Sequence, residues 1–197
     1  MKTNRRQFAA ILALSVSMAC ATTGPSVPVP PNIADGLNLE PHSADQRALS
    51  ELLIQLIQAD TSNPPGNEGA AVAVLAAFFK AHDIPTKTIS APGLEDRPIL
   101  IAHLKAARRF KKPMVLLGHT DVVPADAKAW KNGIKPFGGR QQDGYIWGRG
   151  ALDMKGMLAV EAMSLVLIKR HFMDSKSHKL ERDLFFVATP DEEDQGL

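Results

Sequence analysis

Three short clusters of polar residues carry the residue types in this chain that are suited to catalysis. The first contains His119 and Asp121, the second contains Asp153, and the third contains Glu192 and Glu193. Imidazole and carboxylate groups are ligands for zinc and other divalent ions, and a carboxylate beside a metal can also act as a base. The three clusters therefore predict a metal-dependent active site, provided that the fold brings them into one pocket.

In the first cluster, His119 and Asp121 are two positions apart, so on an extended chain their side chains lie on the same face. An imidazole that binds a metal through one nitrogen usually donates its other N–H to a carboxylate, which fixes the orientation of the ring. Asp121 is placed for that role. A histidine at a strand end followed by a turn-forming aspartate explains the same residues equally well, so this cluster alone does not decide.

The second cluster is a single aspartate, Asp153, which stands after Gly148 and Gly150 and directly before a long apolar segment. The glycines permit tight backbone geometry at this point. One interpretation makes Asp153 a metal ligand. The alternative makes it the N-cap of the helix that follows, because aspartate is among the preferred N-cap residues.

The third cluster is the adjacent pair Glu192 and Glu193. On an extended backbone their side chains point to opposite sides, so one can bind a metal while the other faces a substrate. A carboxylate near a metal-activated water can take its proton during attack and return it to the leaving nitrogen. The alternative is a solvated acidic loop, since Asp191 and Asp194 flank the pair.

Helices and buried strands alternate along the rest of the chain. The run 114–118 is almost wholly apolar, which is typical of a central strand covered on both faces. The alternation predicts an α/β fold, a three-layer sandwich with a central and mostly parallel sheet. Helical spacing of apolar residues predicts helices that start at Ser43 and span 70–80 and 154–170, and strands are expected at 86–90, 99–105, 114–118, 145–147 and 183–189.

The predicted strands also locate the clusters. Ligands in open α/β sheets bind beyond the carboxyl ends of the strands. His119 follows the predicted strand 114–118, and Asp191 follows the predicted strand 183–189. We therefore expect the first and third clusters to meet at one edge of the sheet.

The first 42 residues differ in kind from the rest. Basic residues, among them Arg5 and Arg6, precede an apolar run that is too short for a membrane anchor, which predicts a signal peptide over residues 1–21. The arginine pair is similar to a twin-arginine signal. Residues 22–42 are rich in proline and predict an extended tether, and residues 43–197 form the folded part. We expect an exported protein, periplasmic or extracellular.

Charge and cysteine content limit the partners and the kinds of site that the protein can have. The 197 residues carry a formal net charge of +2, and the basic residues are scattered, so we predict no nucleic-acid partner. Cys20 is the single cysteine, which excludes an intramolecular disulfide and a thiolate zinc site. It is also a candidate for a lipid anchor, although Ser17 stands where a lipobox has a Leu-like residue.

The clusters and their surroundings resemble the aminoacylase/carboxypeptidase family of co-catalytic zinc hydrolases. This family includes carboxypeptidase G, carboxypeptidase S, aminoacylase, acetylornithine deacetylase and succinyl-diaminopimelate desuccinylase. The resemblance extends from about Ser43 to the end of the chain. It is carried by residues 61–68 (TSNPPGNE), 118–124 (GHTDVVP), Trp130, 136–137 (PF), 143–144 (DG), 148–156 (GRGALDMKG) and 189–193 (TPDEE).

The resemblance implies a role for each cluster residue. His119 is implied to bind one zinc ion, Asp153 to bridge two zinc ions, and Glu193 to bind the second. Glu192 is implied to be the general base, and Asp121 the carboxylate that steadies His119. Members of the family carry two further ligands and a lid domain that come later in the sequence. The resemblance thus implies that residues 43–197 are the N-terminal portion of the catalytic domain, inactive by themselves.

The function that follows is a zinc-dependent metallopeptidase or amidohydrolase. It is expected to cleave a peptide or an N-acyl-amino-acid amide bond through a metal-activated water, with two zinc ions or other divalent metals bound in the full-length protein. The substrate is a small peptide or an N-acyl amino acid. Two alternatives remain open: a deacylase of an amino-acid metabolite, and a non-catalytic binding module that keeps the fold.

Overall fold

The computed structural model describes residues 43–90, 96–174 and 179–194. The predicted signal peptide, the tether and Cys20 lie outside the described residues and stay predictions. Among the residues that are described, no helix has both the length and the apolar character needed to cross a membrane.

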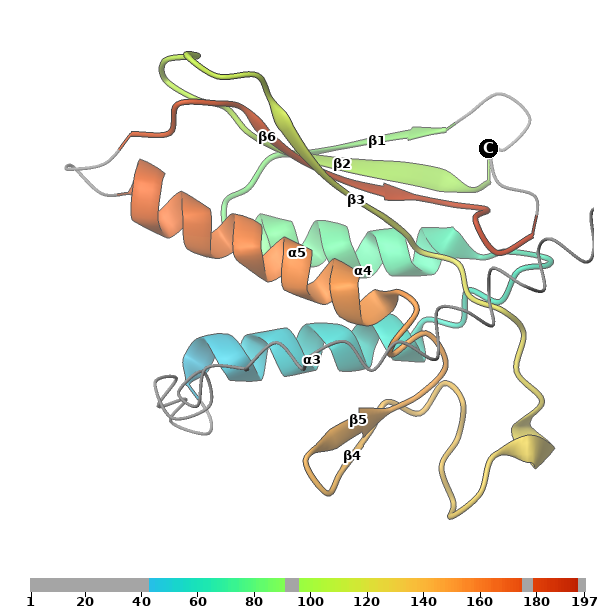
Figure 1. Cartoon of the computed structure of the whole chain (residues 1–197). Coiled ribbons are helices and arrows are strands. Elements are labelled where there is room, and N and C mark those ends of the chain that lie inside the picture. The colour runs from blue at the N-terminus through green and yellow to red at the C-terminus, as the bar shows by residue number, and fades with distance from the viewer. Residues whose placement is uncertain (1–42, 91–95, 175–178, 195–197) are drawn as a thin grey trace, which may run out of the picture. The chain divides into compact units, whose positions relative to one another are not determined.

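Four strands form the main sheet, in the order β1-β2-β6-β3 (Figure 1). Two pairings, β1 with β2 and β2 with β6, are antiparallel, whereas β3 and β6 run parallel. The parallel pair matters most for function because its two carboxyl ends lie side by side. The strands are β1 (Thr86–Ser90), β2 (Pro98–Leu104), β3 (Met114–His119) and β6 (Leu184–Thr189).

The predicted α/β class is confirmed, and the strands begin and end close to the predicted positions. Over the described residues, however, the sheet is mixed, and the parallel arrangement holds only for β3 and β6. The reason lies in the connections. Only seven positions separate the last residue of β1 from the first of β2, at Ser90 and Pro98. A parallel crossover needs a connection of about a dozen residues or more, so these two strands pair antiparallel.

The described helices lie on one side of the sheet (Figure 1). Helices α4 (Glu68–Ala81) and α5 (Lys155–Ile168) pack against the sheet, and α3 (Ala44–Gln58) lies on the side of these helices away from it. Helix α3 starts directly after its N-cap Ser43, close to the predicted start, and this start is a capping box in which Ser43 and Gln46 each accept a hydrogen bond from the backbone of the other. The layers expected of a sandwich are therefore present on this side of the sheet.

The hydrophobic core lies between the sheet and the helices. Phe79 of α4 and Phe186 of β6 are fully buried, and their rings meet edge to face with centroids 5.1 Å apart. In β6 the residues at alternate positions are buried, as expected for a strand with one face on a core. This packing fixes the place of β6, whose last residue leads into the acidic cluster.

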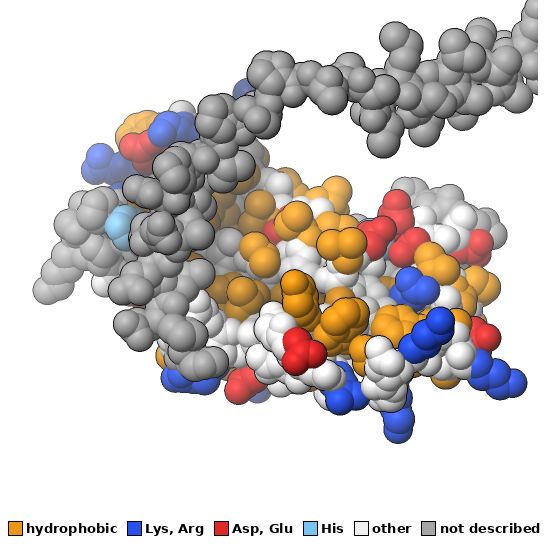
Figure 2. All heavy atoms as spheres, turned by 60° about the horizontal axis from the view of Figure 1, so that its bottom comes forward, with side chains coloured by type: hydrophobic (Ala, Val, Ile, Leu, Met, Phe, Trp, Pro, Cys, Tyr) orange, Lys and Arg blue, Asp and Glu red, His pale blue; other side chains and the backbone are white. Residues whose placement is uncertain are grey.

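The prediction that strand 114–118 is a central strand covered on both faces is wrong for the described part of the chain. Strand β3 is at the edge of the sheet, and the side chains of Val115 and Leu117 are exposed. An apolar run shows that a strand is compatible with burial, but it does not show which strands or helices lie beside it. Hydrophobic side chains also reach the surface in the view of Figure 2, with charged side chains around them.

A smaller sheet and two short helical turns complete the described elements. Strands β4 (Arg140–Gln142) and β5 (Tyr145–Trp147) form an antiparallel hairpin. A 3-10 turn, η1 (Ala127–Ala129), precedes the hairpin, and a π-helical turn, η2 (Lys169–Met173), follows α5. The hairpin leads directly into the glycine-rich segment that ends at Asp153.

Candidate metal centre

The parallel pair of strands brings the first and third clusters together. His119 is the last residue of β3 and stands opposite Thr189, the last residue of β6. The backbone N–H of Thr120 donates to the carbonyl of Thr189 at 2.8 Å, which continues the ladder one residue beyond the strand. The two strand ends therefore deliver His119 and the 191–193 turn to the same edge of the sheet, as the sequence predicted.

The imidazole of His119 is buried and has carboxylates near both nitrogens. Its Nε2 atom lies 3.2 Å from Oδ1 of Asp153 and 3.7 Å from Oε2 of Glu192. Its Nδ1 atom lies 3.1 Å from the backbone carbonyl of Asp121 and 3.5 Å from Oδ1 of the same residue. Asp121 thus contacts the nitrogen that faces away from Asp153 and Glu192.

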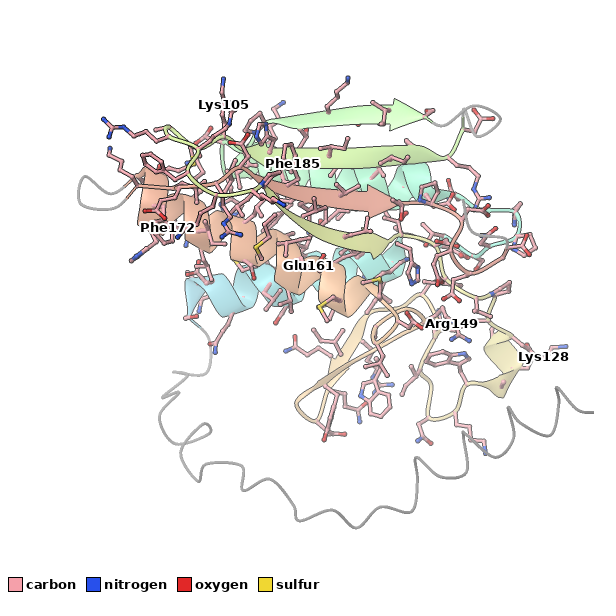
Figure 3. The ribbon with its side chains drawn as sticks, turned by 45° about the horizontal axis from the view of Figure 1, so that its top comes forward. Lys105, Lys128, Arg149, Glu161, Phe172 and Phe185 are labelled. Atoms are coloured by element: carbon pink, nitrogen blue, oxygen red, sulfur yellow. The ribbon has the colours of Figure 1, made fainter. Side chains whose placement is uncertain are left out.

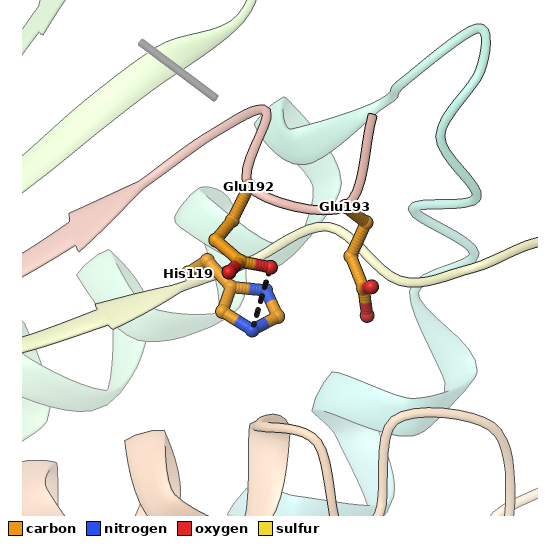
Figure 4. Close-up of side chains that lie close together, drawn as sticks. All are labelled: His119, Glu192 and Glu193. Atoms are coloured by element: carbon orange, nitrogen blue, oxygen red, sulfur yellow. Dashed lines mark ion pairs between the residues drawn. The ribbon is translucent and has the colours of Figure 1, made fainter. Parts of the chain in front are cut away.

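Three side chains converge in a way that suits a metal ion. One ligand atom from each of His119, Glu192 and Glu193 lies within 4.8 Å of the others (Figure 4). Asp153 joins this group through its contact with His119. The structure therefore brings together the five residues that the sequence singled out, while their separate roles as ligand or base stay predictions.

Asp153 is not a helix cap. The N-cap of α5 is Met154, with no side-chain cap hydrogen bond, and the Asp153 side chain is 77% exposed. The interpretation of Asp153 as the N-cap of the following helix is therefore wrong. The tight turn before Asp153 favours glycine at position 150, where φ is +78°. A Cβ atom at this position would also lie 2.6 Å from a methyl carbon of Val122.

Asp121 is fully buried, and its carboxylate organises the turn that carries the two glutamates. The backbone N–H of Glu192 donates to Oδ1 at 3.2 Å, and the N–H of Glu193 donates to Oδ2 at 2.9 Å. The side-chain amide of Asn63 donates to Oδ2 at 2.8 Å. Asp121 therefore fixes both sides of the site, the His119 ring and the Glu192–Glu193 backbone.

These contacts shift the pKa values of His119 and Asp121 in opposite directions. Burial alone would lower the pKa of His119, but the hydrogen bonds to Asp121 and Asp153 outweigh it and raise this pKa to about 9. Burial alone would raise the pKa of Asp121, but the hydrogen bonds from His119, from both glutamate amides and from Asn63 bring it far below the usual range. These hydrogen bonds therefore favour the ionised form of the Asp121 carboxylate.

The environment of Glu193, the third acidic residue of the 191–193 turn, differs from that of Asp121. Burial raises the pKa of Glu193, and the nearby charges of Asp153 and Glu192 raise it further, although the charge of His119 opposes both effects. Carboxylates gathered around a single imidazole leave an excess of negative charge at this edge of the sheet. A divalent cation would offset that excess, and imidazole nitrogen and carboxylate oxygen are the donor atoms that zinc accepts. The residues present therefore fit a metal ion.

The loop 61–66 before α4 lies beside the segment that follows His119. A parallel bridge joins Ser62 to Val122, with the N–H of Asn63 donating to the Val122 carbonyl at 2.9 Å. The hydroxyl of Thr61 donates to the carbonyl of Thr120 at 2.6 Å. The early loop quoted in the resemblance is therefore bound to the segment that follows His119.

Sequence reasoning missed four polar residues around the site, of which three are buried and one, Arg97, is partly buried. Lys155 is fully buried, and its ammonium donates to the carbonyls of Leu56 and Ala59 at the end of α3. Burial lowers the pKa of Lys155 to about 8. The other three are Asn63, Glu68 and Arg97. Three of these residues, Lys155, Asn63 and Glu68, lie inside the motifs that carry the family resemblance, and those motifs could have identified them. Nothing in the sequence around Arg97 set it apart.

Comparison with protein families matches residues 115–197 to the family described as Peptidase family M20/M25/M40. The matched segment contains all three clusters. A curated relative, succinyl-diaminopimelate desuccinylase of Methylorubrum extorquens, is 35% identical over 142 residues, covering 70% of this chain and 34% of that protein. The N-fatty-acyl-amino acid synthase/hydrolase PM20D1 of Bos taurus is 38% identical over 97 residues, covering 48% of this chain and 17% of that protein.

A solved structure with the same fold is the M20 family metallo-carboxypeptidase Sso-CP2 from Sulfolobus solfataricus. It superposes with a TM-score of 0.57 at 18% sequence identity, over 75% of this chain and 31% of that one. The chain therefore spans about a third or less of the length of these three proteins.

Proposed function

Since the chain belongs to peptidase family M20/M25/M40, we propose that the protein is a metal-dependent hydrolase of an amide bond in a small peptide or an N-acyl amino acid. The observation that carries this proposal is the position of the His119 ring. Nε2 faces the carboxylates of Asp153 and Glu192, while Nδ1 faces Asp121. One nitrogen is thus directed at the candidate metal position, and the other is held from behind by a buried carboxylate.

We assign metal binding to three residues, His119, Asp153 and Glu193, which would hold the metal when it is bound. Zinc is the proposed metal because the set combines one imidazole with carboxylates. A bound zinc ion lowers the pKa of water and polarises the carbonyl oxygen of the substrate. Asp121 keeps the imidazole of His119 oriented and available on its Nε2 side.

Glu192 is the residue that we assign to proton transfer. Its side chain is 63% exposed, so solvent and substrate can reach it, and its backbone is fixed by the hydrogen bond to Asp121. In the proposed reaction, Glu192 takes a proton from the water that attacks the carbonyl carbon. It then delivers that proton to the nitrogen that leaves when the C–N bond breaks.

The substrate class is supported by the names of the relatives. The activities in these two names, a desuccinylase and an N-fatty-acyl-amino acid synthase/hydrolase, both concern an acyl group on an amino compound. We therefore rank N-acyl amino acids before dipeptides. The desuccinylase similarity also supports a second candidate function, a deacylase dedicated to one amino-acid metabolite. A panel of N-acyl amino acids, dipeptides and N-succinyl-diaminopimelate distinguishes these candidates by the ratio of kcat/KM values.

The decisive experiment is Glu192→Gln in the full-length protein. Turnover should fall by about 10²–10⁴-fold, as is typical when a general base is removed, while the metal content measured by atomic absorption stays at the wild-type level. Glu181→Gln is the matched control, because Glu181 pairs with Lys111 in an exposed ion pair remote from the three clusters. Near-normal turnover of Glu192→Gln with metal bound would assign the base to another residue.

A further inference from the structure

Behind the candidate metal centre lies a continuous series of polar side chains, all of them buried except Arg97, which is partly buried. It begins at Asp121, which contacts His119, and passes through Asn63 to Asp191. From Asp191 it passes through Arg97 to Glu68. The four members beyond Asp121 belong to neither the predicted ligands nor the predicted base, so their function needs a separate explanation.

The amide of Asn63 bridges two carboxylates. Its Nδ2 atom donates to Oδ2 of Asp121 at 2.8 Å and to Oδ1 of Asp191 at 2.9 Å, and the residue is only 2% exposed. An amide nitrogen carries two hydrogens, so both are used. Without this bridge, two buried carboxylates would face each other with no donor between them, which is costly in a poorly solvated environment.

Arg97 anchors the other end of the series. One terminal nitrogen donates to Oδ1 of Asp191 at 2.6 Å. Nε and the second terminal nitrogen both donate to the carboxylate of Glu68, which is fully buried at the start of α4. A guanidinium suits this position because its planar arrangement of donors binds two carboxylates in fixed directions, which a lysine ammonium does not.

This series controls the backbone that carries the glutamates. Asp191 precedes Glu192 directly and has a φ of +67°, a conformation that a residue other than glycine rarely adopts without support. Its side chain is held by Asn63 and Arg97, while Asp121 holds the N–H groups of Glu192 and Glu193. The turn is therefore fixed on both sides by carboxylates that Asn63 joins.

We propose that Asn63 and Arg97 are positioning residues of the metal centre, which hold Asp121 and the 191–193 turn so that the His119 imidazole and the two glutamate carboxylates converge. The inference rests on the proposed metal-dependent function. A purely structural role would let Asn63 and Arg97 affect only the free energy of unfolding. A positioning role requires that they also affect the affinity and the geometry of the bound ion.

The test uses Asn63→Asp, which preserves the size of the side chain but replaces its donor with a third carboxylate. Zinc affinity of the full-length protein is measured by competition with a chromogenic chelator, and the geometry of the site is followed by the visible spectrum of the Co²⁺-loaded protein. Loss of groups that orient metal ligands typically costs about 10–100-fold in metal affinity, and we expect a loss of that size together with an altered spectrum.

Two arginine variants complete the design. Arg97→Lys keeps the charge but loses the planar donors, so we expect a smaller loss in zinc affinity than for Asn63→Asp, and it serves as the main test if that variant does not fold. Arg109→Lys is the control, since Arg109 donates to Asp183 at 2.7 Å beside the opposite end of β6. It should leave zinc affinity and the Co²⁺ spectrum unchanged.

The outcomes separate the two proposals. If the wild-type protein binds neither zinc nor Co²⁺, the proposed function fails, and the inference fails with it. If the wild-type protein binds zinc and the folded Asn63→Asp and Arg97→Lys proteins match its affinity and spectrum, only the inference is overturned. A lower melting temperature with an unchanged spectrum at saturating Co²⁺ would also overturn the inference, because it would show a structural role alone.

Discussion

The two ends of strand β6 carry similar ion pairs in different surroundings. Asp183 precedes the strand and accepts from Arg109 at 2.7 Å, and Asp191 follows the strand and accepts from Arg97 at 2.6 Å. The Arg109 side chain is 54% exposed, whereas that of Arg97 is 14% exposed. The two distances are nearly equal, so distance alone would rank the pairs as equivalent.

Burial separates the two ends. An exposed ion pair contributes little because water screens it, while breaking a buried pair leaves an uncompensated charge. In Figure 3 Lys105, next to the Asp183 end of β6, and Arg149, in the segment that leads to Asp153, lie on opposite sides of the picture. The end with the buried pairs is the end with the candidate site. The comparison therefore supports the proposal that the polar series positions the site in addition to stabilising the fold.

The largest expected difference is in the free energy of unfolding after one acceptor carboxylate is removed near each end of β6. Asp121→Ala leaves the N–H groups of Glu192 and Glu193 and the Asn63 amide without their buried partner. We expect the free energy of unfolding to fall by about 3–5 kcal/mol, the range for breaking a buried charged pair, and zinc binding to weaken. Asp183→Ala should lower the free energy of unfolding far less. Chemical denaturation of the metal-free full-length protein measures both, and equal losses would remove the distinction between the ends.

The residues of the candidate metal centre could be predicted from the sequence. His119, Asp121, Asp153, Glu192 and Glu193 were singled out by residue type and spacing, and they converge. Strand positions were also predictable, since alternation and apolar runs depend on local sequence. The capping box at Ser43 was readable for the same reason, because it involves residues three apart.

The parts that the sequence did not predict depend on distant contacts. Arg97 meets Glu68 and Asp191 across separations of 29 and 94 positions, and no local pattern encodes such a meeting. The edge position of β3 likewise depends on which strands pair, and the apolar run at 114–118 is equally compatible with a central strand. Local patterns thus predicted the residues that converge at the candidate metal centre, and three-dimensional packing was needed to identify the polar residues behind them.

A smaller difference in stability is expected when two lysines, one buried and one exposed, are each replaced. Lys155 is fully buried near the site, and its ammonium donates to two carbonyls at 2.8 and 2.7 Å, whereas Lys111 pairs with Glu181 and is 55% exposed. Lys155→Met leaves both carbonyls without that donor. Each unpaired buried carbonyl costs about 1–3 kcal/mol, partly offset because a buried charge is removed, so we expect a loss of about 2–4 kcal/mol in the free energy of unfolding. Lys111→Met should change thermal unfolding only slightly, and a similar shift for both variants would contradict the comparison.

The smallest expected difference tests how firmly Arg97 is held. Gly66 and Gly144 share a φ of +80°, so an alanine at either position pays a similar cost for left-handed backbone, about 1–2 kcal/mol. Only Gly66 is crowded: a Cβ atom there would lie 2.6 Å from Nε of Arg97, while nothing lies within 4 Å at Gly144. If Arg97 were as mobile as an exposed arginine, it would move aside, and the two variants would be equally stable.

The contacts of Arg97 with Glu68 and Asp191 oppose that movement. Forcing an extra carbon into a well-packed site costs about 1–3 kcal/mol, so Gly66→Ala should be less stable than Gly144→Ala by about that amount. It should also bind zinc more weakly, because displacing Arg97 releases Asp191 and the turn that follows it. Denaturant unfolding and chelator competition on the two full-length variants measure these differences. Equal stability and equal zinc affinity would show that Arg97 yields easily, and would remove it from the residues that position the metal centre.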